Sequence, residues 1–238
     1  MTLADSSVHL QLVPDIIQTS TEENHLIKVW GRASSSNVQC VMWCAAELGL
    51  EVERVDAGLM YGVNDTPDYL AMNPNGTVPT LVDGDGPPLW ESGAILRYLA
   101  NAYAEHPFWP SDLVERANVD RWAEWSKVSV QMAFSKPIFW KVIRTVSEQR
   151  DVAQISNAVK VFESKLQIAE QRLSKNRYLA GSSFTLADIQ FGHVLYRYYE
   201  IDIERAPLEQ LRQYYKKLTE LPHYRAHVMV NFDELRAE

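Results

Sequence analysis

The stretch from residue 73 to residue 98 limits the fold most, because it reads as a turn, a strand, a hairpin and a helix start without interruption. Residues 73–76, Asn-Pro-Asn-Gly, favour a turn, since proline fixes φ and Asn and Gly tolerate positive φ. A strand is expected over residues 78–82, where Pro79 stands so near the start that only an edge or a first position tolerates its missing N–H. Residues 83–86, Asp-Gly-Asp-Gly, turn the chain back into a short partner strand. The sequence therefore predicts an antiparallel hairpin that leads directly into a helix.

The same stretch predicts a surface for an extended peptide. If the bond between Val78 and Pro79 is cis, Val78 turns its N–H and C=O away from the sheet and offers them to a ligand, as in strand addition. Ser92 is expected to cap the following helix, where its hydroxyl and the unpaired N–H groups favour a carboxylate. Glu91 is placed to pair with an ammonium group. A ligand with a peptide backbone and a free amino-acid head satisfies all three, and glutathione is such a molecule.

These motifs, NPNGTVPTLVDGD followed by LWESGAILRYL, resemble in order and spacing the glutathione site of the cytosolic glutathione transferases. In that family a cis-proline follows a valine, and a Glu-Ser or Gln-Ser pair opens the third helix. The resemblance runs from about residue 26 to about residue 230, and GRASSSNVQCVMW is its closest local match to bacterial serine- or asparagine-type members. The alternative, a hairpin and helix cap without a ligand, leaves this order of motifs unexplained. The glutathione-binding residues that the resemblance implies are Thr77, Val78, Pro79, Glu91 and Ser92.

The segments before the hairpin predict a thioredoxin-like α/β domain. Strands over 26–30 and 51–57 flank a helix from about residue 37 to residue 49, which is the right-handed crossover of a parallel pair. A short helix over 67–73 follows, with Thr66 as its cap and proline at its first position. With the hairpin and the helix after it, the element order is βαβαββα.

The rest of the chain reads as all-α. Residues 105–112, EHPFWPSD, break helical periodicity with two prolines and read as a linker. Long helices are expected over 113–135, 137–149 and 152–175, and further helices near Pro207 and Pro222. We therefore expect four parts: a flexible N-terminal extension at 1–24, the thioredoxin-like domain at 25–104, the linker at 105–112 and an all-helical domain at 113–238.

Residues 184–189, Phe-Thr-Leu-Ala-Asp-Ile, predict a capping box with a hydrophobic staple. Thr185 is expected to accept from the N–H of Asp188, the Asp188 carboxylate to reach back, and Phe184 to pack on Ile189. The resemblance implies a similar box at the core helix of the second domain, so we assign these residues to folding.

Composition excludes several classes of function. The net charge of -8 disfavours nucleic acid and anionic membranes as partners. No apolar run approaches the roughly 20 residues that span a bilayer, and the N-terminus lacks the pattern of a secretory signal. Cys40 and Cys44, the two cysteines, cannot build a disulfide scaffold. We expect a soluble cytoplasmic protein without a metal.

The loop at the start of the first helix supplies candidates for thiol activation. A free thiol titrates near about pH 8.5, so attack at neutral pH needs roughly 2.7 kcal/mol of thiolate stabilisation, which one or two hydrogen bonds and a helix N-terminus can provide. Ser35 aligns best with the serine of serine-type transferases, Asn37 with the asparagine of some bacterial relatives, and Ser36 lies between them. The alternative is that all three only cap the helix. A redox role for Cys40 or Cys44 is disfavoured, because both lie beyond the helix start and read as buried core thiols.

The resemblance places a second-substrate pocket between this loop and the fourth helix. Trp122, Trp125 and Met132 fall on that helix, although an aromatic stripe at helical spacing also suits a plain core. Thr77 stands where many relatives have a basic residue, so the glycyl carboxylate of glutathione has no obvious partner. Arg32 could contact that carboxylate, the second substrate or solvent, and the sequence leaves these three alternatives open.

The sequence thus predicts a two-domain glutathione transferase that joins glutathione thiolate to a small electrophile, a halogenated one included. Its partners are glutathione and that electrophile, and the family implies a homodimer. The alternatives are another glutathione-dependent reaction, such as peroxide reduction, dehalogenation or isomerisation, and a noncatalytic binding protein with the same fold.

Overall fold

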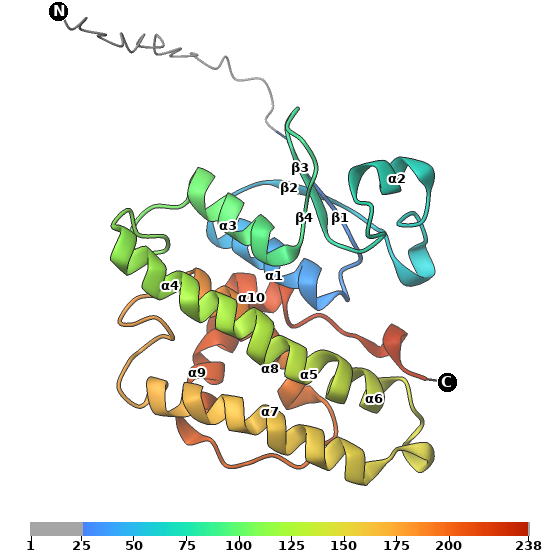
Figure 1. Cartoon of the computed structure of the whole chain (residues 1–238), viewed down its shortest axis with the longest axis vertical. Coiled ribbons are helices and arrows are strands. Elements are labelled where there is room, and N and C mark those ends of the chain that lie inside the picture. Colours follow the sequence, from blue (N-terminus) through green and yellow to red (C-terminus); the bar gives the residue numbers. More distant parts are fainter. Residues whose placement is uncertain (1–25, 238) are drawn as a thin grey trace, which may run out of the picture.

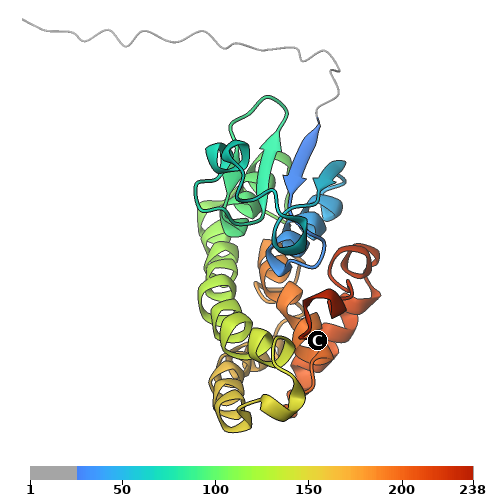
Figure 2. The same cartoon turned by 90° about the vertical axis from the view of Figure 1, so that its right-hand side faces the viewer.

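The structure, a computed structural model, describes residues 26–237, so the extension predicted at 1–24 lies outside the described residues. The sheet and its helices occupy one end of the molecule and the long helices the other (Figures 1 and 2). The α/β part and the all-helical part are both present, as expected. Residues 104–112 between them form neither helix nor strand, and the domain boundary there stays a prediction.

A four-stranded mixed sheet with the order β2-β1-β3-β4 forms the α/β part. β1 (Ile27–Trp30) pairs in parallel with β2 (Val52–Val55), and α1 (Ser36–Glu47) connects them, which confirms the predicted crossover. In β1 alternate side chains are buried, because one face of the strand packs on the core.

The predicted hairpin follows with a shifted start. β3 (Thr80–Asp83) runs antiparallel to β1 and to β4 (Leu89–Trp90). β3 begins two residues later than the strand predicted over 78–82, so Val78 and Pro79 precede the ladder. A 3₁₀ turn (Leu59–Tyr61), α2 (Pro67–Met72) and α3 (Ser92–Tyr103) complete the order βαβαββα.

α1 lies between the sheet domain and the long helices. It packs on α3 and on two helices of the C-terminal part, α8 (Leu186–Glu200) and α10 (Pro222–His227). Trp43 of α1 is fully buried, and its ring centroid lies 4.8 Å from that of Tyr224 in α10. The core therefore continues from one part of the chain into the other.

Residues 113–143 form one continuous helical run, where the sequence predicts two helices separated near Pro137. The run ends at Ile143, and the predicted helix over 137–149 is wrong beyond that point, since residues 144–146 are irregular. Proline lacks the N–H for an α-helical bond, and the wider π-helical turn around Pro137 accommodates it. The segments are α4 (Leu113–Trp125), a π-helical segment (Ser126–Gln131), α5 (Met132–Phe134), a second π-helical segment (Ser135–Phe139) and α6 (Trp140–Ile143).

The remaining helices lie close to their predicted places. A 3₁₀ turn (Ser147–Gln149) precedes α7 (Val152–Leu173), and a last one (Asp233–Leu235) follows α10. α9 (Glu209–Glu220) begins two residues after Pro207. The capping box of α8 forms as predicted. The contact of Phe184 with Ile189 stays a prediction.

Candidate functional site

A cavity of about 480 Å³ opens between the start of α1, the turn before β3 and the helical run 126–140. Eight of the predicted site residues line it: Arg32, Ser35, Ser36, Asn37, Thr77, Val78, Glu91 and Met132. The sequence analysis did not predict the others: Gly58, Leu59, Asn64, Gly76, Lys127, Gln131, Ser135, Trp140 and Arg197.

Ser35 is the N-cap of α1, and its side chain is available to a ligand. Its backbone is extended, and its carbonyl accepts the N–H groups of Val38 and Gln39 at 2.9 and 2.8 Å. Its hydroxyl makes no capping bond. The residue is 6% exposed and faces the cavity. A hydroxyl donor therefore stands beside the free N–H groups of a helix start, where the helix dipole favours negative charge.

Asn37 is held by other side chains. Its Oδ1 accepts from Gln131 Nε2 at 2.6 Å and from the Ser92 hydroxyl at 3.4 Å. Gln131 belongs to the π-helical segment 126–131, so Asn37 links the α/β part to the helical run. Ser36 also lines the cavity.

The turn before β3 fixes the backbone beside the cavity. The Val78–Pro79 peptide bond is cis. The carbonyl of Thr77 accepts from the Tyr69 hydroxyl at 2.6 Å and from Asn73 Nδ2 at 2.9 Å. Pro79 is buried behind Val78 and does not line the cavity. Two polar side chains, neither of them predicted for the site, therefore set the orientation of this turn.

The cap of α3 differs from the prediction. The N-cap is Glu91, with φ of 68°, and Ser92 is the first helical residue. Ser92 is 2% exposed, and its hydroxyl accepts from Lys127 Nζ at 2.5 Å. The same ammonium lies 3.9 Å from Glu91 Oε2. Lys127, from the helical run, thus places a positive charge beside Glu91 and Ser92. The sequence analysis did not predict this contact, because Lys127 lies in an ordinary helical pattern.

Two buried arginines form another part of the wall. Arg32 is 8% exposed and Arg197, from α8, is 4% exposed. Arg197 donates to the carbonyl of Ser34, and its guanidinium lies 4.4 Å from the Phe139 ring centroid. Burial, together with the charge of the neighbouring Arg32, lowers the pKa of Arg197 to about 9. Burial likewise lowers the pKa of Arg32.

Trp122 and Trp125 do not line the cavity, so the pocket prediction for them is corrected. Their rings pack against each other at 5.3 Å, and Trp125 stacks on the buried Phe191 at 6.0 Å. The π-helical segment 126–131 explains the difference, because its wider turn rotates Met132 away from the face that carries the two tryptophans.

Cys40 and Cys44 are both fully buried in α1. Burial raises the pKa of the Cys40 thiol to about 11 and that of the Cys44 thiol well above its ordinary value. Neither thiol lines the cavity, which agrees with the prediction of core thiols.

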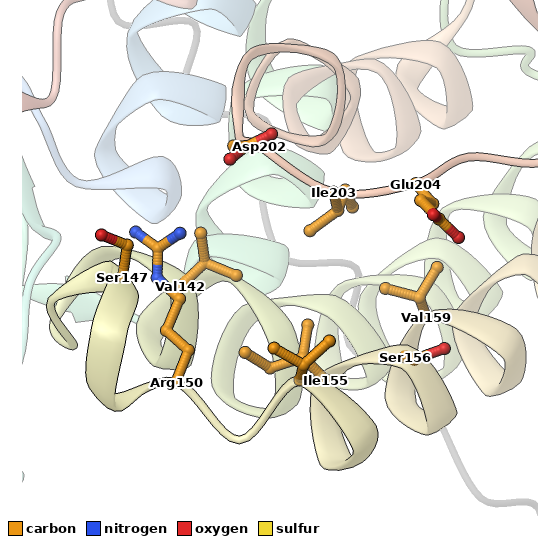
Figure 3. A pocket seen from close by; sticks show the side chains of 10 residues that line it. Val142, Ser147, Arg150, Ile155, Ser156, Val159, Asp202, Ile203 and Glu204 are labelled. Atoms are coloured by element: carbon orange, nitrogen blue, oxygen red, sulfur yellow. The ribbon is translucent and has the colours of Figure 1, made fainter.

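A second cavity, of about 490 Å³, lies between α7 and the loop after α8 and contains none of the predicted site residues. In Figure 3 the segment with Asp202, Ile203 and Glu204 faces Ile155 and Ser156 across it. Among residues 26–237, no group of three or more His, Cys, Asp or Glu side chains is arranged to hold a metal ion. No helix in that range is long and apolar enough to cross a membrane.

Comparison with known proteins shows the same two-part organisation. Residues 26–101 match the model of the glutathione S-transferase N-terminal domain, and residues 132–222 match that of the C-terminal domain. Glutathione S-transferase GstB of Escherichia coli (strain K12) is 34% identical over 206 residues, which are 86% of this chain and 99% of that protein. Glutathione S-transferase 3 of Zea mays is 35% identical over 167 residues, 68% of this chain and 73% of that protein.

A solved structure is similar over the same range. The theta class glutathione S-transferase of the citrus canker pathogen Xanthomonas axonopodis pv. citri, crystallised with glutathione bound, is 41% identical with a TM-score of 0.82. The match covers 87% of this chain and 99% of that one. With both family domains in order and a relative matched over nearly its whole length, the chain belongs to the glutathione S-transferase family and is a transferase.

Proposed function

We propose that the 480 Å³ cavity binds glutathione and that the chain transfers its thiolate to a small electrophile. The observation that carries this proposal is the convergence of a helix start, a cis-proline turn and Glu91 on one cavity. Ser92, next to Glu91, is buried and does not line the cavity. The bound glutathione in the similar theta class structure supports it.

In the proposed complex the tripeptide backbone lies against Val78, and the amino-acid head lies at the start of α3. The head carries an ammonium and a carboxylate. Glu91 receives the ammonium, while Ser92 and Lys127 receive the carboxylate. This arrangement leaves the cysteinyl sulfur over the start of α1, where the Ser35 hydroxyl donates to it. Stabilisation and orientation of the thiolate then supply most of the catalysis.

The test is glutathione binding by calorimetry, together with turnover of chlorodinitrobenzene by the wild-type chain and two variants. Ser35→Ala is expected to lower kcat about 100-fold, which corresponds to roughly 2.7 kcal/mol of lost thiolate stabilisation, with little change in glutathione affinity. Asn37→Ala is the matched variant and is expected to lower kcat much less. If Asn37→Ala abolishes turnover and Ser35→Ala does not, the donor is Asn37. Binding without turnover of any electrophile would indicate a noncatalytic protein.

We also propose that the chain acts as a cytoplasmic homodimer. Large apolar side chains are exposed on the loop between β2 and α2, including Met60 at 54% and Leu59 at 47%. Contiguous exposed apolar side chains often mark protein interfaces. Light scattering coupled to gel filtration measures the mass, and a monomer at micromolar concentration would contradict the proposal.

A further inference from the structure

Arg32 and Arg197 place two buried guanidinium groups in the wall of the cavity, and one nitrogen atom of each group has no hydrogen-bond partner among the described residues. Both residues line the cavity and are more than nine-tenths buried. The Nε atom of each is buried without a hydrogen-bond acceptor among the described residues. A buried charged donor is costly unless it is paired. This pair of guanidinium groups is therefore a candidate binding site for an anion.

Carboxylates nearby do not satisfy the pair. Glu234 raises the pKa of Arg32 through its charge, while Arg144 acts in the opposite direction. Glu234 itself accepts from the Ser34 hydroxyl. Within residues 26–237, no carboxylate lies within ion-pair distance of either cavity arginine.

The pair also lies directly beside the proposed thiol donor. The carbonyl of Arg32 accepts the backbone N–H of Ser35 at 3.1 Å, and the guanidinium of Arg197 donates to the carbonyl of Ser34. Arg32 and Arg197 therefore line the same cavity as Ser35, over which the sulfur is expected. An anion held there lies close to the reacting thiolate.

The side chains around the pair come from the helical run 113–143 and from the segment after α10. Met132 and Trp140 line the same cavity, and the Phe139 and Phe232 rings lie 4.4 and 5.8 Å from the Arg197 guanidinium. Aromatic faces hold a guanidinium in place and leave its edge free for a planar, bidentate carboxylate. Lys127, at the Glu-Ser pair, is a separate cation and serves the amino-acid head of glutathione.

We propose that the second substrate carries a carboxylate, which Arg32 and Arg197 bind beside the reacting sulfur. The inference rests on the proposed function and names its substrate class. For an α-halo carboxylate, the thiolate attacks the α-carbon, the C–S bond forms, and the C–halogen bond breaks as halide leaves with the electron pair. No further reactant is required. Three cations and one carboxylate line the cavity of a chain with net charge -8, so the field there attracts anions.

The test compares iodoacetate with iodoacetamide, which differ in charge and hardly in size. The rate enhancement for each is kcat/KM divided by the uncatalysed rate constant with glutathione. We expect the enhancement for iodoacetate to exceed that for iodoacetamide by about 10- to 100-fold, the range of a hydrogen bond to a charged group. Arg32→Gln is expected to lower this ratio at least about 10-fold. Arg212→Gln is the matched control, because Arg212 is exposed on α9 and does not line the cavity.

Calorimetry with the two products gives a second measurement that needs no turnover. S-carboxymethylglutathione is expected to bind the wild-type chain about 10-fold more tightly than S-carbamidomethylglutathione, and Arg32→Gln is expected to remove the difference. If Arg32→Gln does not fold, the affinities of the two products for the wild-type chain still test the inference.

Equal enhancements and equal product affinities in the wild-type chain overturn the inference. So does an Arg32→Gln variant that raises the glutathione KM equally with both electrophiles, because Arg32 then holds the glycyl carboxylate. Turnover of chlorodinitrobenzene but of neither iodo compound overturns this inference alone. Failure with all three electrophiles overturns the proposed function as well.

Discussion

Lys127 shows, at the scale of a single residue, why the site could be predicted only in part. The predicted residues Ser35, Val78 and Glu91 lie in local motifs whose composition identifies a helix start, a turn or a cap. Lys127 reaches Ser92 from 35 positions away along the chain, and Arg197 reaches Ser34 from 163 positions away. No local pattern encodes such contacts, because they depend on how the helical run packs against α1 and α3.

Lys127→Met is expected to weaken glutathione binding about 10-fold, roughly 1.4 kcal/mol. The ammonium contacts Ser92 Oγ at 2.5 Å, and a charge-assisted hydrogen bond to a ligand carboxylate contributes about 1.5–3 kcal/mol, part of which is lost to solvent screening. Calorimetric titration with glutathione measures the change.

Lys136→Met is the matched control, since Lys136 is exposed and does not line the cavity. Equal glutathione affinities for Lys127→Met and the wild-type chain would remove Lys127 from the binding site.

At the scale of elements, the sequence predicted most helices and strands but not the geometry of the run 113–143. Turn residues, prolines and hydrophobic periodicity mark where elements begin and end. π-Helical segments have no such composition, and each one rotates the side chains that follow it. For this reason Met132 lines the cavity, while Trp122 and Trp125, predicted for the same pocket, pack against the core.

The start of α8 provides a prediction for stability. The Asp188 carboxylate accepts from the Thr185 N–H at 2.9 Å, the Leu179 N–H at 2.9 Å and the Tyr214 hydroxyl at 2.8 Å. Asp188→Ala leaves these buried donors without an acceptor, so a loss of roughly 3 kcal/mol or more is expected. Thr185→Ala removes one hydroxyl and is expected to cost about 1 kcal/mol.

Urea unfolding followed by circular dichroism measures both changes. Thr185→Ser, which keeps the hydroxyl, is the control and is expected to stay within about 0.5 kcal/mol of the wild-type chain. Unchanged unfolding of Asp188→Ala would show that the box does not support α8.

At the scale of the whole molecule, the α/β part and the helical part pack closely against each other at Gly192 of α8. A Cβ atom added there would lie 2.6 Å from Leu218 Cδ1 and 3.1 Å from the Trp43 ring. Leu218 and Trp43 are fully buried and come from α9 and α1, so this contact joins the α/β part to two helices of the C-terminal part. Close-packed interiors tolerate added volume poorly.

Gly192→Ala is expected to destabilise the chain by about 1–3 kcal/mol and to lower the midpoint of one common transition, in far-UV circular dichroism and in tryptophan fluorescence alike. Gly181→Ala is the control, because a Cβ there meets nothing within 4 Å. Separate transitions by the two probes would show that the parts unfold independently.

The burial of Cys40 and Cys44 has a consequence for a catalyst of this kind. An enzyme that binds an alkylating agent next to a glutathione thiolate, as proposed here, is itself exposed to alkylation at its own thiols. Both of its own thiols are buried within α1, and their raised pKa keeps them protonated at neutral pH. If the proposed electrophiles are its substrates, we therefore expect the two cysteines to resist alkylation by them during turnover.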